Sequence, residues 1–180
     1  MRKILISGLF LCILSSCYTI PKKVLSQSYP EQPRRDEYHF SRKKFEFNPK
    51  IDTSVAYLAR ENWYVNRSSQ LTTEYSFIRF SGDGVAFVSK SDERMPKDRD
   101  FNEMMNGQFC LYLVTEKKIT VEIYDHVYRQ FYYLDGELND SGFVFSCDRQ
   151  RHWWSAKEKI SQQHFVKIAG KPTTPIKFPH

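Results

Sequence analysis

Short runs of apolar and aromatic residues alternate with turn-forming residues from about residue 49 to residue 170. The pattern is clearest at 118–124, where Ile119, Val121 and Ile123 alternate with polar neighbours, as in a strand with one buried face. No segment sustains helical periodicity for long, so the pattern predicts an all-β domain of about eight strands. The expected strand segments are 55–60, 74–81, 85–89, 108–115, 118–124, 129–134 with a short further run at 137–138, 143–147 and 164–168.

Glycine-containing turns separate several of these runs. Gly82-Asp83-Gly84 and Asp135-Gly136 are sequences that close tight hairpins, because glycine takes positive φ without steric cost. Connections this short make successive strands antiparallel neighbours, and closure of the sheet removes its two free edges. The sequence therefore predicts a small antiparallel up-and-down barrel over residues 49–170.

One longer connection interrupts the expected barrel at residues 92–106. It is charged, contains Pro96 and has the composition of one helical turn near residues 99–105. Two interpretations stay open: a lid or crossover at one end of the barrel, or a solvated connection.

The chain begins with a short basic and then apolar segment. Arg2 and Lys3 precede an apolar stretch at residues 4–14, which is too short to remain as a membrane-spanning helix and is typical of a secretory signal peptide at residues 1–16. It ends in Leu14-Ser15-Ser16-Cys17, which resembles the lipobox of bacterial lipoproteins. The resemblance implies cleavage before Cys17 and lipidation of its thiol, and two or three acyl chains anchor a protein stably to a membrane. The alternative is an ordinary cleaved signal with a coincidental cysteine.

Residues 17–48 are polar and contain Pro21, Pro30 and Pro33, so we expect a lipidated N-terminus followed by a flexible tether. A proline-containing tail is expected at residues 171–180. In lipoproteins of Gram-negative bacteria the residues after the lipidated cysteine influence sorting, and an aspartate there is linked with inner-membrane retention. Here 18–20 are Tyr-Thr-Ile. By that resemblance we expect the periplasmic face of the outer membrane.

Composition and charge narrow the functional classes. Aromatic residues make up 16% of the 180, which favours β structure. Loss of residues 1–16 removes Arg2 and Lys3 and no acid; 25 basic against 21 acidic residues remain, and the net charge falls from +6 to +4. This small charge, without a dense basic cluster, does not favour binding to nucleic acid.

Several strand and turn motifs together resemble the lipocalin-like lipoproteins of Bacteroidetes. They are the run at 75–80 before the Gly-Asp-Gly turn, Gly107-Gln-Phe-Cys-Leu-Tyr, Lys118-Ile-Thr-Val-Glu-Ile and Tyr132-Tyr-Leu-Asp-Gly-Glu-Leu, within residues 50–168. The resemblance implies a calycin-type barrel on a lipid anchor, with a small apolar ligand. The chain lacks the Gly-x-Trp near the first strand that marks typical lipocalins.

Aromatic residues supply the candidate contacts for a ligand or partner. Tyr124 and Tyr132 belong to a group of rings that either lines a pocket or fills the core. The pair Trp153-Trp154 is a candidate contact for a partner or a membrane interface, or else plugs one barrel end.

A second, fainter resemblance involves Ser141 and Lys157. Ser141-Gly142-x-x-Phe145, followed by the segment 151–157 that ends in Lys157, is similar to two elements of membrane-bound lysozyme inhibitors. In that family a serine and a lysine enter the acidic lysozyme cleft, so the resemblance implies an inhibitor of a cell-wall hydrolase.

Enzymatic motifs are not found. The five histidines are scattered without metal-ligand spacing, and neither a nucleophile motif nor a phosphate or dinucleotide loop occurs, so we expect no enzyme activity, metal or cofactor. Cys110 and Cys147 remain after lipidation of Cys17. Either they form a disulfide in an oxidising compartment, or they are two separate buried thiols.

Together these features predict a membrane-anchored periplasmic lipoprotein whose barrel is a binding or structural module. Its partner is a small apolar ligand or a protein. The alternative function is inhibition of a cell-wall hydrolase.

Overall fold

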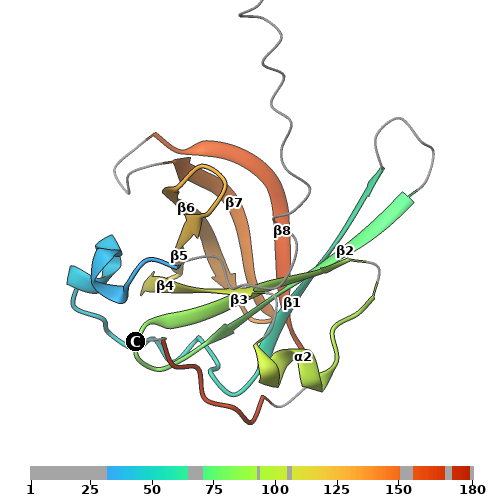
Figure 1. Cartoon of the computed structure of the whole chain (residues 1–180), viewed down its shortest axis with the longest axis horizontal. Helices are drawn as coiled ribbons and strands as arrows, with labels where there is room; N and C mark the ends of the chain where they lie inside the picture. The colour runs from blue at the N-terminus through green and yellow to red at the C-terminus, as the bar shows by residue number, and fades with distance from the viewer. Residues whose placement is uncertain are drawn as a thin grey trace, which may run out of the picture.

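The computed structural model describes residues 32–64, 71–92, 94–104, 107–150, 156–168 and 172–178, and it confirms the all-β prediction. Eight antiparallel strands follow one another in chain order around a closed barrel, which Figure 1 shows. They are β1 (Ala56–Tyr64), β2 (Leu71–Phe80), β3 (Val85–Asp92), β4 (Gly107–Thr115), β5 (Lys118–Asp125), β6 (Gln130–Asn139), β7 (Gly142–Gln150) and β8 (Glu158–Ile168). Strand β8 pairs with β1 and so closes the sheet. No helix among the described residues is both long enough and apolar enough to cross a membrane.

The expected period-two pattern of β5 is confirmed on its inner face. Ile119, Val121 and Ile123 are at most 1% exposed and belong to the cluster inside the barrel. The predicted tight turn between β2 and β3 is also present, and Gly84 has φ +85°, a conformation that glycine adopts without strain. Local sequence therefore accounts for these features.

The hairpin turn predicted at Asp135-Gly136 is wrong, because β6 runs through both residues without a break. Opposite them β7 has a bulge, with Ser146 as the extra residue between the two that pair with Asp135 and Gly136. A Cβ on Gly136 would lie 2.4 Å from the backbone oxygen of Val144. This glycine therefore permits close approach of two strands, a role that the sequence pattern does not distinguish from a turn.

Aromatic rings fill much of the described barrel interior. Phe80 and Tyr112 lie with their ring centroids 4.7 Å apart, and Phe143 stacks on Phe165 at 5.1 Å. The Tyr112 hydroxyl donates a hydrogen bond of 2.6 Å to the Ser81 carbonyl, so burial of that ring leaves its polar atom satisfied. Of the two interpretations of the aromatic excess, these rings fit the one in which they fill the core.

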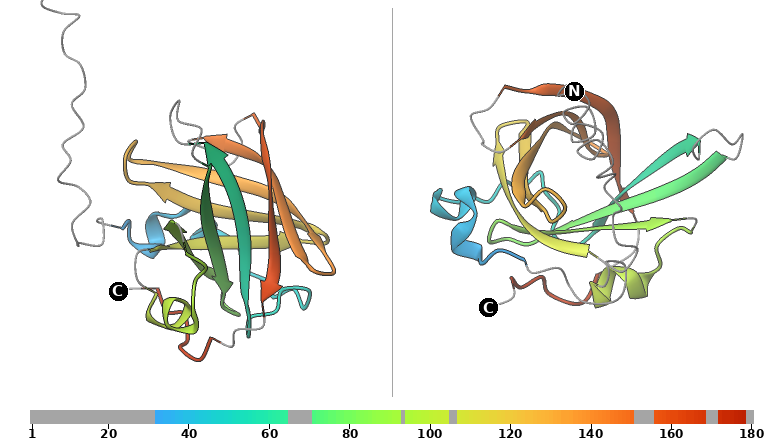
Figure 2. Two further views of the ribbon diagram at one scale, coloured as in Figure 1. Left: turned by 90° about the vertical axis from the view of Figure 1, so that its right-hand side faces the viewer. Right: turned by 45° about the horizontal axis from the view of Figure 1, so that its top comes forward.

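A second hydrophobic cluster covers part of the outside of the barrel. Outward-facing Phe77, Phe87 and Leu111 are buried beneath three segments that lie outside the sheet. These segments are residues 35–42, which form the turns η2 (Arg35–Glu37) and η3 (His39–Arg42) and bury Tyr38 and Phe40, the short helix α2 (Asp98–Glu103), and the C-terminal residues 172–178. Figure 2 shows η2 and η3 in blue against the outside of the barrel, and the red C-terminal segment beside α2.

The loop that was expected as a lid or a solvated connection packs on this outer cluster. Phe101 of α2 is 3% exposed, and its ring meets that of Phe77 edge-on at 4.9 Å. The buried Arg79 donates to the carbonyl oxygens of Phe101 and Thr174, at 2.6 and 2.5 Å. One arginine on β2 therefore holds both α2 and the C-terminal segment in place.

The boundaries of the folded unit differ from the predicted ones. Within the expected tether, Tyr38 is fully buried and Phe40 is 7% exposed; within the expected tail, Ile176 and Phe178 are 7% and 8% exposed. Residues 35–45, called here the N-terminal segment, and residues 172–178 thus belong to the folded unit. The prolines and charged residues of these two segments predict an unfolded chain, because only a few apolar side chains in each segment pack against the barrel.

Candidate ligand-binding cleft

The bulge in β7 determines which of its side chains point outward. Before Ser146, Phe143 and Phe145 belong to the inner cluster. After it the alternation shifts by one residue, so Arg149 lies outward, directly opposite Tyr133 of the outer cluster. The bulge therefore brings an arginine to the outer wall of the barrel.

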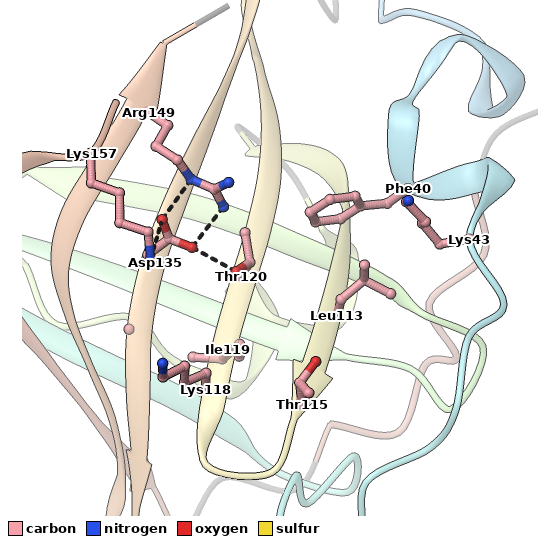
Figure 3. Close-up of a pocket in the computed structure, with 11 residues that line it drawn as sticks. Phe40, Lys43, Leu113, Thr115, Lys118, Ile119, Thr120, Asp135, Arg149 and Lys157 are labelled. Atoms are coloured by element: carbon pink, nitrogen blue, oxygen red, sulfur yellow. Dashed lines mark hydrogen bonds and ion pairs between the residues drawn. The ribbon is translucent and has the colours of Figure 1, made fainter. Parts of the chain in front are cut away.

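Arg149 forms a buried ion pair with Asp135 of β6. Its Nη2 donates a hydrogen bond of 2.7 Å to Asp135 Oδ1, and its Nε lies 2.7 Å from Oδ2, an ion-pair contact without hydrogen-bond geometry. Asp135 is 7% and Arg149 9% exposed. Thr120 donates to the same carboxylate at 2.7 Å, and Lys157 Nζ lies 3.3 Å from Oδ2 (Figure 3). The guanidinium also lies over the Tyr133 ring, 5.4 Å from its centroid.

A second buried carboxylate, Glu122 of β5, anchors the N-terminal segment. Its oxygens accept backbone N–H groups from His39 and Phe40, each at 2.8 Å, and the Tyr133 hydroxyl at 3.1 Å. His39 Nδ1 lies 3.0 Å from the same carboxylate. Because Glu122 is fully buried, these donors replace the water that an exposed carboxylate would bind. They position η3 over β5, beside the ion pair.

A cleft of about 270 Å³ lies between η3 and the outer wall formed by β4 to β7. Phe40 and Leu113 lie on one side of it, and the Asp135–Arg149 pair lies on the other (Figure 3). The residues that line this outer cleft are Phe40, Lys43, Leu113, Thr115, Lys118, Ile119, Thr120, Asp135, Gly136, Arg149 and Lys157. The arrangement combines an apolar wall with fixed charges, which suits non-covalent binding of a small molecule or a single side chain.

Comparisons of the chain with protein families, curated proteins and solved structures found no match. Assignment of the outer cleft therefore depends on its own geometry and chemistry. The lipoprotein resemblances of the sequence stay predictions.

The residues predicted to contact a ligand or partner are not brought together. Tyr132 lies in the inner cluster, where burial raises the pKa of its hydroxyl, whereas Tyr124 lies outside and packs against Phe131 at 5.3 Å. Only Lys157 is part of the outer cleft. The candidates Cys17, Trp153 and Trp154 lie outside the described residues.

Ser141 and Lys157, the two residues singled out by the lysozyme-inhibitor resemblance, lie at separate places on the barrel wall. Ser141 lies in the turn between β6 and β7, where its hydroxyl donates to Asn139 Oδ1 at 2.8 Å. Lys157 approaches Asp135, four residues earlier along β6 than Asn139, a separation of roughly 13 Å at about 3.3 Å per residue.

The outer cleft contains residues that the sequence did not single out. The sequence pattern predicts a turn at Asp135 and a tether that includes Phe40 and Lys43. A signal was present for Thr120, which occupies a polar position in the alternating strand and was expected to face away from the core. No local signal reveals Arg149, because its direction depends on the bulge.

Cys110 and Cys147 are both free thiols in the structure. Cys110 is buried in the inner cluster, whereas Cys147 is paired with the outward-facing Asp135. The two side chains thus lie on opposite faces of the barrel wall with two strands between them. Of the two alternatives left open by the sequence, this arrangement fits two separate thiols.

This arrangement predicts different reactivities for the two thiols. In a chain beginning at residue 18, Ellman's reagent should modify Cys147 in the native state and leave Cys110 protected, because burial excludes the reagent and raises the pKa of the Cys110 thiol. After unfolding without reductant both thiols should react. Cys147→Ala should abolish the native reaction, and fewer than two thiols in the unfolded wild type would show that a disulfide does form.

Proposed function

We propose that the protein is a lipid-anchored binding module of the bacterial cell envelope, held by Cys17 at the periplasmic face of the outer membrane. The signal-like segment and the lipobox-like Leu14-Ser15-Ser16-Cys17 support the anchor. The closed barrel supports a binding role, because it supplies a rigid wall on which side chains keep a defined geometry.

The outer cleft is the proposed binding site. The observation that carries this proposal is the Asp135–Arg149 ion pair, buried at one side of a cleft whose other side is Phe40. In the lumen, by contrast, the described rings pack against each other at centroid separations near 5 Å, such as 5.2 Å for Tyr57 and Phe143. This packing gives the expected small apolar ligand in the lumen less support than a ligand in the outer cleft.

Inhibition of a cell-wall hydrolase has less support. It requires Ser141 and Lys157 to act together, and they lie at separate places on β6 and its neighbours. Lys157 is half-exposed and already approaches a carboxylate of its own chain.

Substitution of the lipidation site tests the anchor. We expect Cys17→Ala to abolish acylation and to remove the protein from the outer-membrane fraction of its host, because position 17 then carries no thiol that can accept a lipid. Cys12→Ala is the matched control: it lies within the expected signal peptide and should leave both processing and membrane association unchanged. Labelled fatty acid incorporation and cell fractionation measure the two outcomes. Retention of the Cys17→Ala protein in outer-membrane fractions would contradict the proposal.

A further inference from the structure

We infer that the outer cleft takes a small organic anion: a carboxylate or phosphate group on a compact apolar body. This inference rests on the proposed binding function and names the class of ligand. It follows from the charge of the lining residues, the apolar wall and the size of the cleft.

The charges that line the outer cleft are unbalanced. Its described lining includes four cationic residues, Lys43, Lys118, Arg149 and Lys157, but a single carboxylate, Asp135. Arg149 holds both oxygens of that carboxylate, at 2.7 Å each, so most of the negative charge is already neutralised by one partner. The lysine side chains lie at exposed positions around the opening. An anion placed among them reduces the repulsion between like charges.

Two carboxylates outside this lining lie near it. Exposed Glu137 of β6 is the register partner of Lys118 and offsets part of that lysine's charge, which leaves Lys43, Arg149 and Lys157 against Asp135. The second, Glu122, does not change this balance. Glu122 is fully buried beneath η3, and its oxygens accept hydrogen bonds from two backbone amides and from Tyr133. His39 lies against the same group. Glu122 therefore stabilises the wall of the cleft and is not part of its lining.

The apolar side and the volume limit the rest of the ligand. Phe40 and Leu113 face the ion cluster across the cleft, as Figure 3 shows, and offer a surface for one ring or a short aliphatic chain. The volume of about 270 Å³ lies just below the range of roughly 300–1,000 Å³ that is typical of drug-sized ligands. A long acyl chain or a second ring would therefore extend beyond the cleft.

Three probes of almost the same shape and different charge test the inference: benzoate, benzamide and benzamidine. Each is titrated into the full-length chain, purified in a nonionic detergent, while methyl NMR signals of Leu113, Thr115 and Thr120 are followed. We expect benzoate to shift these signals with saturation, benzamide to bind at least about fivefold more weakly, and benzamidine to bind most weakly. Phenyl phosphate is a fourth probe. Tighter binding of benzoate would assign the anionic group to a carboxylate, and tighter binding of phenyl phosphate would assign it to a phosphate.

Matched lysine substitutions localise the effect. Lys157→Met should weaken benzoate binding about threefold to fivefold, because it removes one half-exposed charge at the rim. Lys97→Met is the control: it removes an exposed lysine just before α2, which packs on β2 and not on the outer cleft. Equal binding of benzoate and benzamide would overturn the inferred ligand class and leave the cleft as a binding site. If no probe shifts cleft signals, both this inference and the proposed binding site fail.

Discussion

Arg149→Met should destabilise the barrel by about 3 kcal/mol, the lower end of the cost of breaking a buried ion pair. The substitution removes the hydrogen bond and the ion-pair contact that Arg149 makes with Asp135, a residue that is 7% exposed in the wild type. Only Thr120 and the partly solvated Lys157 then remain beside the carboxylate. A methionine fills most of the vacated volume, so the loss is chiefly electrostatic. The free energy of unfolding, measured by urea denaturation, is the quantity to compare with the wild type.

A double variant separates the effect of the unpaired charge from that of lost packing. Asp135→Asn combined with Arg149→Met should recover most of the lost stability, because neither buried charge is then present. Its free energy of unfolding should lie within about 1 kcal/mol of that of the wild type. Lys157→Met is the control for an exposed charge on the same carboxylate and should cost less than about 1 kcal/mol. The single variant Asp135→Asn completes the cycle. If the stability lost in the double variant equals the sum of the losses in Arg149→Met and Asp135→Asn, the two charges are not coupled and the interpretation of the ion pair is wrong.

Glu122→Gln should release the N-terminal segment and lower the free energy of unfolding by about 2–4 kcal/mol. The carboxylate accepts two backbone N–H bonds of 2.8 Å, and hydrogen bonds to charged groups contribute about 1.5–3 kcal/mol each. The amide that replaces it can accept through one atom only, and its NH₂ group would face a second donor. Amide hydrogen exchange at His39 and Phe40 should therefore accelerate more than exchange in the strands.

Glu46→Gln is the matched control for this change. Glu46 is also a glutamate close to the N-terminal segment, but its side chain is 76% exposed and pairs with an equally solvated Lys44. Its loss should alter stability by less than about 0.5 kcal/mol. Because Phe40 forms one side of the outer cleft, Glu122→Gln should also weaken benzoate binding. Unchanged exchange at Phe40 in this variant would show that other contacts hold the segment in place.

The two largest expected effects both involve residues whose burial the sequence does not reveal. Thr120 and Glu122 alternate with inward-facing apolar residues, and this pattern correctly places them on the outer face of β5. The same pattern predicts a solvated carboxylate at position 122. The structure shows instead that a segment more than 80 residues away in sequence covers it.

The strand number, the antiparallel order and the inner face of β5 could be predicted from the sequence, because each depends on neighbouring residues: period-two alternation and short turns act locally. The outer cleft could not. Arg149 points toward Asp135 only because one extra residue in β7 shifts its register, and register depends on the strand opposite. Likewise Cys110 and Cys147 occupy opposite faces of the wall. Long-range pairing thus decided the charges and burial of the candidate site, whereas local pattern determined the barrel that positions it.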